Sequence, residues 1–404
     1  MTPTVLALGL SQTLAWGSTY YLPAVLAGDI ARDTGVSSAT VFAVFSLALL
    51  VSGPLGPWAG RHIDRLGGRA LLMGTNAVFA LGLVLLSQAQ GLWGLVLAWT
   101  VLGLAMGCGL YDAAFATLVR LHGERARNGI TGITLMAGLA STVGWPLSTW
   151  MASAWGWQGA CLGWAALHLL LGLPLNASIP RSPALTNGET LPASAPGAPA
   201  QSVLQDPAAI RAAMWRLGLA FAVAWFTVTA MASHLPRLLQ AHGLTLAAAV
   251  GLGALLGPSQ VAGRLLEMGW LRRWHPQVAA RLASLGHPLG AGALWLAGGA
   301  LAPVFVALHG LGAGILTIAK GALPLALFGP HGYGARLGVI MLPSRIAQGA
   351  APWLFGLALD AWGGAAIGLT ALLGWVVVAC LWTLPQPASA RHGQAQAADH
   401  GQAS

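Results

Sequence analysis

The sequence predicts an all-α polytopic membrane protein in which twelve transmembrane helices form two halves of six. Only 7% of the 404 residues are charged, 56% are hydrophobic, and the mean hydropathy is +0.71. Soluble domains have about 25% charged residues, so a chain with this composition needs lipid as its solvent. A crossing takes about 20 apolar residues, and a helix satisfies its own backbone polar groups, which lipid cannot do.

Twelve apolar segments are long enough to cross a bilayer. The first six are expected at 4–27, 39–59, 70–88, 92–119, 129–153 and 157–175, and the second six at 214–236, 246–268, 278–298, 302–328, 337–358 and 364–384. Between the two sets, 176–213 is polar and holds Pro180, Pro183, Pro192, Pro196, Pro199 and Pro207, which indicates a flexible cytoplasmic linker. We therefore expect an N-terminal half at 1–175, a C-terminal half at 214–385 and a disordered cytoplasmic tail at 386–404.

The positive charges fall in alternate loops between these segments. The loops after segments 2, 4, 6, 8 and 10 hold Arg61, Arg65, Arg69, Arg120, Arg125, Arg127, Arg181, Arg211, Arg272, Arg273 and Arg336, whereas the other loops hold Arg32, beside Asp29 and Asp33, and Arg237. The positive-inside rule then places both termini in the cytoplasm. The formal charge of +9 does not indicate nucleic-acid binding, because no basic soluble domain carries it. The bias toward arginine over lysine, and toward alanine and glycine, indicates a GC-rich bacterial genome. We therefore expect a protein of the bacterial inner membrane.

The cysteines argue against a metal centre. Cys108, Cys161 and Cys380 lie far apart inside apolar segments and lack metal-ligand spacing. We expect no metal and no cofactor. The sequence contains neither a nucleophile–base pairing nor a soluble catalytic domain. It therefore does not indicate a membrane enzyme or a sensor.

The most specific motif is the charged hairpin Gly60-Arg61-His62-Ile63-Asp64-Arg65-Leu66-Gly67-Gly68-Arg69 between segments 2 and 3. It resembles the hairpin of major facilitator superfamily transporters, G-x-x-x-D-R-x-G-R-R. Five residues match: Gly60, Asp64, Arg65, Gly67 and Arg69. Gly68 replaces the first of the two closing basic residues. The resemblance implies two six-helix halves that rock around a central site. It also implies that these five residues control the conformational change. In the family, the aspartate at the position of Asp64 meets the N-terminal end of segment 11, where a helix dipole stabilises a carboxylate. Arg65 and Arg69 are then expected to pair with neighbouring groups.

The second half allows two registers for a copy of this hairpin. One places the copy at 269–274. The other aligns Gly263, Arg264 and Glu267 with Gly60, Arg61 and Asp64. The sequence does not choose between them, and the choice changes the depth of Arg264.

Ionisable side chains inside the segments are the best candidates for a site, because each costs about 2.5–3.5 kcal/mol at the centre of a helix. Arg345 lies about eight residues into segment 11, and Arg264 lies in segment 8. This pair resembles the oxalate:formate antiporter and monocarboxylate transporter branch, in which basic residues of these two helices bind a carboxylate. The alternatives are a structural ion pair for Arg345 and an interfacial position for Arg264.

Other polar residues could complete the site. Asp112 could carry a coupled proton or form a permanent ion pair with an arginine. Lys320 and His309 lie eleven residues apart in segment 10, so they share a side if the helix is regular. His309 is a second proton-coupling candidate, with an interfacial polar group as the alternative. In segment 1, Gln12, Trp16 and Thr19 share a face that could line a cavity or pack in the core. The expected substrate-binding set also includes Tyr20, Tyr111 and Gln348.

These features predict a monomeric secondary transporter in a lipid bilayer. The expected substrate is a small organic anion, a monocarboxylate or similar, moved by proton symport or anion exchange. Efflux of drugs or toxic oxyanions is the alternative. Segment 4 lacks the arginine of drug–proton antiporters, and Gly144-Trp145-Pro146 matches their segment 5 motif only in part. Both differences argue against drug efflux.

Overall fold

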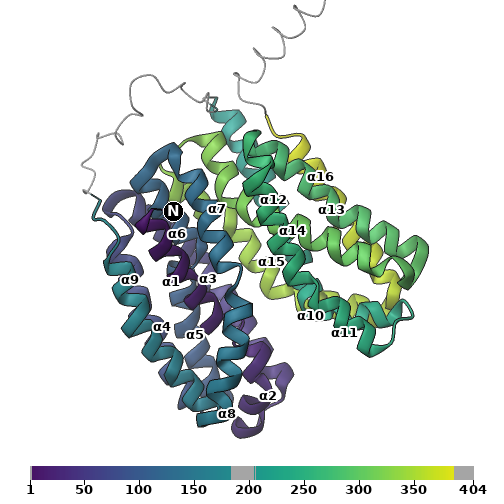
Figure 1. Ribbon diagram of the computed structural model, residues 1–404, viewed down its shortest axis with the longest axis horizontal. Coiled ribbons are helices and arrows are strands. Elements are labelled where there is room, and N and C mark those ends of the chain that lie inside the picture. Colours follow the sequence, from purple (N-terminus) through teal and green to yellow (C-terminus); the bar gives the residue numbers. More distant parts are fainter. Residues whose placement is uncertain (1, 183–203, 205, 386–404) are drawn as a thin grey trace, which may run out of the picture.

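The computed structural model describes residues 2–182, 204 and 206–385, and every regular element among them is helical (Figure 1). The N-terminal bundle contains α1 (Pro3–Ser18), α2 (Pro23–Thr34), α3 (Ser38–Leu66), α4 (Arg69–Ser87), α5 (Gly91–Gly109), α6 (Tyr111–His122), α7 (Ala126–Ala137), α8 (Ala140–Leu167) and α9 (Leu173–Ala177). The C-terminal bundle contains α10 (Pro207–Ala241), α11 (Leu246–Ala254), α12 (Leu256–Gly269), α13 (Pro276–Ala297), α14 (Ala302–Phe328), α15 (Tyr333–Trp362) and α16 (Ala366–Trp382). Short helical turns η1 (Gly123–Arg125), η2 (His168–Gly172), η3 (Leu271–Arg273), η4 (Gly298–Leu301) and η5 (Gly363–Ala365) join several of them.

All twelve predicted segments are mainly helical in the part of the chain that the structure describes, but several are broken. Segment 1 becomes α1 and α2, because the chain turns at Thr19–Leu22 before Pro23 starts a new helix. Segment 4 breaks at Leu110, whose backbone is extended, into α5 and α6. Segments 5 and 6 are joined through α8, where Gly156 has a φ of 73° that a glycine adopts without strain. The predicted linker begins one residue before the end of α9, and α10 begins seven residues before the predicted segment. Most of the linker and the whole predicted tail lie outside the described residues.

The two bundles meet most closely along α3 and α15. A Cβ on Gly60 would lie 2.0 Å from the Gly334 carbonyl oxygen, and a Cβ on Gly338 would lie 2.5 Å from the Gly56 carbonyl oxygen. Small residues therefore let these helices touch at their backbones. This contact lies near the hairpin, and the bundles separate toward the opposite end (Figure 1).

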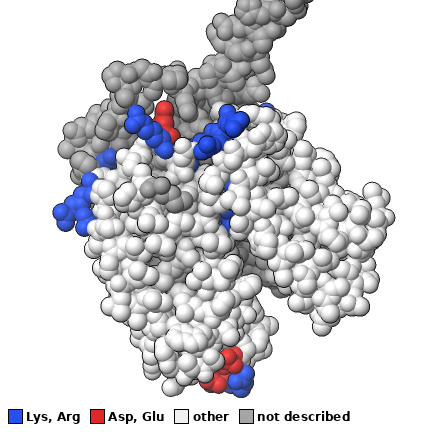
Figure 2. Space-filling view, viewed as in Figure 1, with Lys and Arg blue, Asp and Glu red and all other residues white. Residues whose placement is uncertain are grey.

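Charged side chains on the visible face gather at the end that carries the hairpin, with a small group over α2 at the other end (Figure 2). The surface between them is almost free of charge in this view. Large apolar side chains such as Trp93, Trp215 and Leu296 are at least 79% exposed. An uncharged belt between two polar ends matches the cross-section of a bilayer.

Candidate functional site

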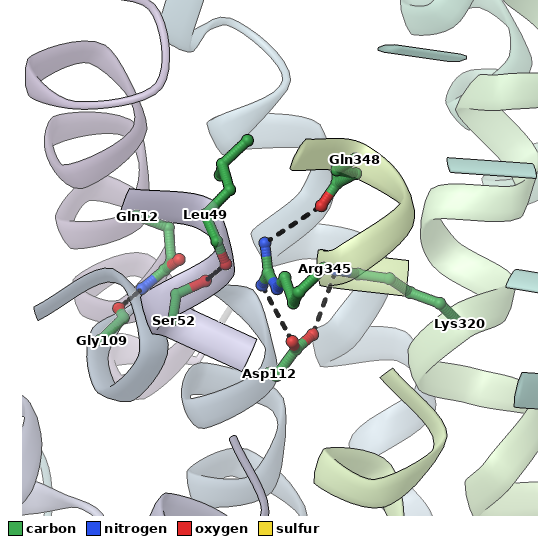
Figure 3. A network of polar contacts seen from close by, with 8 residues as sticks. All are labelled: Gln12, Leu49, Ser52, Gly109, Asp112, Lys320, Arg345 and Gln348. Carbon is green, nitrogen blue, oxygen red and sulfur yellow. Dashed lines mark hydrogen bonds and ion pairs between the residues drawn. The ribbon is translucent and has the colours of Figure 1, made fainter. Parts of the chain in front are cut away.

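A buried ion triad joins the two bundles at the centre of the protein. The Asp112 carboxylate of α6 accepts a hydrogen bond from Lys320 Nζ of α14 at 3.1 Å and from Arg345 Nη2 of α15 at 3.0 Å (Figure 3). Both cations are almost fully buried, and Arg345 also approaches Gln348 Oε1 at 3.5 Å. Of the two roles considered for Asp112, the structure shows the ion pair, and it includes Lys320 as well as Arg345.

The break between α5 and α6 positions this carboxylate. Because α6 begins at Tyr111, Asp112 lies in its first turn, where the helix dipole stabilises a negative charge. Gly109 is the last residue of α5 before the break, and Gln12 Nε2 donates a hydrogen bond to its carbonyl at 2.7 Å. Gln12 thus satisfies a backbone group that lipid could not.

Aromatic rings surround the ammonium group of Lys320. Its Nζ lies 5.1 Å from the ring centre of Tyr111, 5.8 Å from that of Phe115 and 5.5 Å from that of Trp225. Ring faces attract a cation at these distances, and the effect grows when water is excluded. Phe115 and Trp225 were missed by the sequence analysis, because no local pattern links them to Lys320.

Arg264 is a further buried cation near this triad and has no carboxylate partner among the described residues. It is 6% exposed in α12, and its Nε has no hydrogen-bond partner. Its guanidinium lies against Gly138, where an added Cβ would be 1.9 Å from Nη1. It also lies within electrostatic range of the hydroxyls of Tyr21 and Tyr111. The side chain therefore points into the protein between the bundles and is not at the lipid interface.

The site carries an excess of positive charge. Lys320 and Arg345 share the Asp112 carboxylate, and Arg264 adds another buried cation near Tyr111, so these four residues carry two more positive than negative charges. Glu267 does not change this balance, because it pairs with Arg127. Isolated charges are costly away from water, so this excess favours an anionic ligand.

The predicted face of segment 1 is divided by the turn at its end. Trp16 packs at a tilt against Tyr20 and Tyr111, with ring centres 5.1 Å and 5.0 Å away. Thr19 instead donates a hydrogen bond to the Ala15 carbonyl at 2.6 Å. Trp16 and Tyr20 thus lie beside the charged residues, whereas Gln12 and Thr19 satisfy backbone groups.

His309 is not brought to Asp112. Its Nδ1 lies 2.9 Å from Nδ1 of His287 on α13, inside the C-terminal bundle. Both histidines line a cavity of about 30 Å³, the volume of about one water molecule, together with Thr227 and Ser284. Within the described residues, Lys320 and His309 therefore contact different partners despite their spacing.

The hairpin contacts the second bundle through Asp64. Its two oxygens accept hydrogen bonds from the backbone N–H groups of Gly334 at 2.9 Å and Ala335 at 2.8 Å, in the first turn of α15. Gly60 allows the close approach described above, and Gly67 ends α3 with a φ of 83°. The expected ion pairs of Arg65 and Arg69 are not found among the described residues.

The second half contains a matching contact. Glu267 lies two residues before the end of α12, as Asp64 lies two residues before the end of α3, so the structure follows the register that aligns these two acids. Glu267 accepts a hydrogen bond from Thr131 at 3.2 Å and pairs with Arg127 at 3.5 Å, both on α7. Each bundle thus places one acid on the first turns of a helix of the other bundle.

Comparisons with known proteins agree with this architecture. A sequence profile of the Major Facilitator Superfamily matches residues 8–308, so the chain belongs to this superfamily of membrane transporters. The chain is 31% identical over 127 residues to a multidrug resistance protein B homolog of Mycobacterium tuberculosis strain H37Rv. That match covers 31% of this chain but only 23% of the relative.

Solved transporters share the fold over nearly their whole length. The human organic anion transporter MFSD10 superposes with a TM-score of 0.68 at 16% identity, covering 94% of this chain and 98% of that one. The Escherichia coli fucose:proton symporter FucP gives 0.71 at 17% identity, covering 94% and 98%. The proton:xylose symporter XylE gives 0.72 at 13% identity, covering 94% and 96%. The match to the superfamily profile identifies the chain as a membrane transporter, and these solved structures share its fold.

Proposed function

We propose that the protein carries a small organic anion, such as a monocarboxylate, across the bacterial inner membrane in symport with protons. The observation that supports this proposal is the excess of two buried positive charges between the bundles. Arg264 provides the free guanidinium, which can hold a carboxylate through two parallel hydrogen bonds. Arg345 and Lys320 become available when Asp112 releases them.

The ion triad supplies a physical reason for proton coupling. If a proton neutralises Asp112, three cations remain with no counterion. Two unit charges 4 Å apart interact by about 4 kcal/mol at an effective dielectric constant of 20, so a substrate anion is bound far more favourably at that moment. Proton and anion therefore bind together. His309 and its partner His287 lie away from this exchange, and we assign the coupling to Asp112.

The proposed orientation follows from the arginine-rich loops. With the hairpin end in the cytoplasm, residues 1–175 and 214–385 form the two moving halves of a monomer, and 176–213 links them. Both termini are then cytoplasmic. In this orientation the contacts of Asp64 and Glu267 close the cytoplasmic side, and we infer an outward-open state.

Uptake of labelled carboxylates into proteoliposomes under an imposed proton gradient tests the proposal. Arg264→Gln and Arg345→Gln should each abolish saturable uptake, whereas Arg272→Gln, an exposed arginine of η3, should leave it unchanged. Asp112→Asn should abolish proton-driven accumulation while exchange of internal for external anion continues. Accumulation that survives Asp112→Asn would contradict symport and favour anion exchange driven by another gradient.

Efflux of drugs is the alternative that the name of the curated relative suggests. The three buried cations argue against cationic drugs, which would be repelled. Drug resistance that persists in both Arg264→Gln and Arg345→Gln, together with no carboxylate transport by the folded protein, would favour efflux over the proposed function.

A further inference from the structure

The N-terminal bundle presents an aromatic wall to the site. Trp16, at the end of α1, has ring-centre distances of 5.1 Å to Tyr20, 6.4 Å to Tyr21 and 5.0 Å to Tyr111. Offset and tilted rings attract one another within about 4.5–7 Å, so these four side chains form one continuous cluster.

This aromatic wall faces the cations of the C-terminal bundle. Lys320 Nζ lies 5.1 Å from the Tyr111 ring, and Arg264 lies within electrostatic range of the Tyr111 hydroxyl. The Tyr20 hydroxyl lies within electrostatic range of Arg345. One side of the site is therefore cationic and the other side is aromatic, with Asp112 the one acid between them among the described residues.

Two hydrogen-bond donors at this boundary have no partner. Trp16 is 7% exposed and its Nε1–H donates to no group of the described chain, and the same holds for Arg264 Nε. A buried donor without an acceptor is rare in native proteins, and none is satisfied by lipid. One donor belongs to the aromatic wall and one to the cationic side, so a ligand between them can satisfy both.

We infer that the substrate is an amphipathic anion with a flat, aromatic body. Its anionic group binds Arg264 on the cationic side, its ring packs against Trp16 of the aromatic wall, and an acceptor on it takes the Trp16 N–H. A short aliphatic acid would satisfy the charge but would add no ring contact to the aromatic wall. The inference rests on the proposed function, because it names the substrate class of the same site.

Competition against uptake of a labelled acid in proteoliposomes tests the substrate class. The panel compares acids of equal charge that differ in their bodies: propionate and pyruvate against phenylacetate and indole-3-acetate. Burying one aromatic ring should improve the apparent affinity about tenfold or more over the aliphatic acids. Direct uptake of labelled phenylacetate and labelled pyruvate shows which acids are transported and which only compete.

Variants of Trp16 separate stacking from hydrogen bonding. Trp16→Leu should weaken the aromatic acids about tenfold while changing the aliphatic acids less than about threefold. Trp16→Phe keeps a ring but removes the N–H, so it should retain the preference for aromatic acids and weaken all acids that accept this bond. Trp93→Leu, a tryptophan that is 80% exposed at the start of α5, is the matched control and should change nothing. Size-exclusion chromatography in detergent establishes that each variant is folded, and Trp16→Phe carries the test if Trp16→Leu does not fold.

The outcomes distinguish the two proposals. Aromatic preference that is lost in Trp16→Leu supports the inference. Equal or better transport of propionate and pyruvate overturns the inference and leaves the proposed function intact. No transport of any acid by folded protein, with Arg264→Gln indistinguishable from wild type, overturns both.

Discussion

Replacing Asp64 with asparagine should loosen the contact between the bundles at the hairpin end. The carboxylate accepts two backbone hydrogen bonds from the first turn of α15, at 2.9 Å and 2.8 Å. Asparagine keeps one acceptor oxygen, places an NH₂ group against the second N–H, and removes the charge that the helix dipole stabilises. The Gly60 contact and the shape of the interface stay unchanged.

The size of the effect follows from those two bonds. A hydrogen bond to a charged group contributes about 1.5–3 kcal/mol, and a charge at a helix terminus adds about 0.3–1 kcal/mol. We expect Asp64→Asn to destabilise the closed hairpin end by about 2–3 kcal/mol, which shifts the equilibrium toward opening about 30- to 150-fold. The shift should raise the population of the state that is open at this end.

Double electron–electron resonance measures the distance between spin labels placed at Arg125 and Arg272, and it can detect this change. Both residues are exposed at the hairpin end, one in η1 of the first bundle and one in η3 of the second. Wild type should give mainly short distances, and Asp64→Asn should add a longer population. Asp29→Asn, which breaks an exposed ion pair on α2, is the control. An unchanged distance distribution in Asp64→Asn would refute the reasoning, because the contact would then contribute nothing to the conformational equilibrium.

Three further predictions concern groups near the same end. Glu267→Gln should shift the same equilibrium by only about 1 kcal/mol, because the ion pair and the hydrogen bond of Glu267 are long. The same pair of spin labels measures this shift. Gly60→Ala should open the interface, because the new Cβ would lie 2.0 Å from a carbonyl oxygen of α15. Gly74→Ala is the control and should not open it, because nothing lies within 4 Å of that position. The same distance measurement compares the two variants. Burial, helped by two nearby arginines, lowers the pKa of His275 from its usual 6.5, and its neutral Nδ1 accepts from the Gln277 N–H. The unfolded chain therefore takes up the proton first as pH falls below about 6.5, so stability should decrease there, and His275→Asn should flatten that part of the profile in thermal unfolding between about pH 7.5 and about pH 5.5.

The charged residues show where sequence reasoning succeeds and where it stops. An arginine or lysine inside an apolar segment is recognisable from the sequence alone, because its cost in lipid does not depend on the fold. Its partner is not recognisable in the same way. Asp112 lies 208 residues from Lys320 and 233 residues from Arg345, so no local pattern could predict that it binds both.

Helix breaks show the same limit at short range. The predicted crossing at 92–119 is apolar throughout its first part, and the pattern gives no sign that the backbone is extended at Leu110. At the break, Gln12 from another helix donates a hydrogen bond to the Gly109 carbonyl. A helix pattern describes one segment, whereas the stability of a break depends on what packs against it.

By itself, the sequence determined the membrane environment, the twelve crossings in two sets of six and the superfamily, because composition, segment length and the hairpin motif are properties of the chain. Only the tertiary structure decided that Asp112 pairs with two cations, that Arg264 has no carboxylate partner among the described residues, and that Glu267 is the counterpart of Asp64. Those facts depend on the rotation and depth of each helix against its neighbours. Helix packing sets these two quantities, and apolar segments of similar composition do not encode them locally.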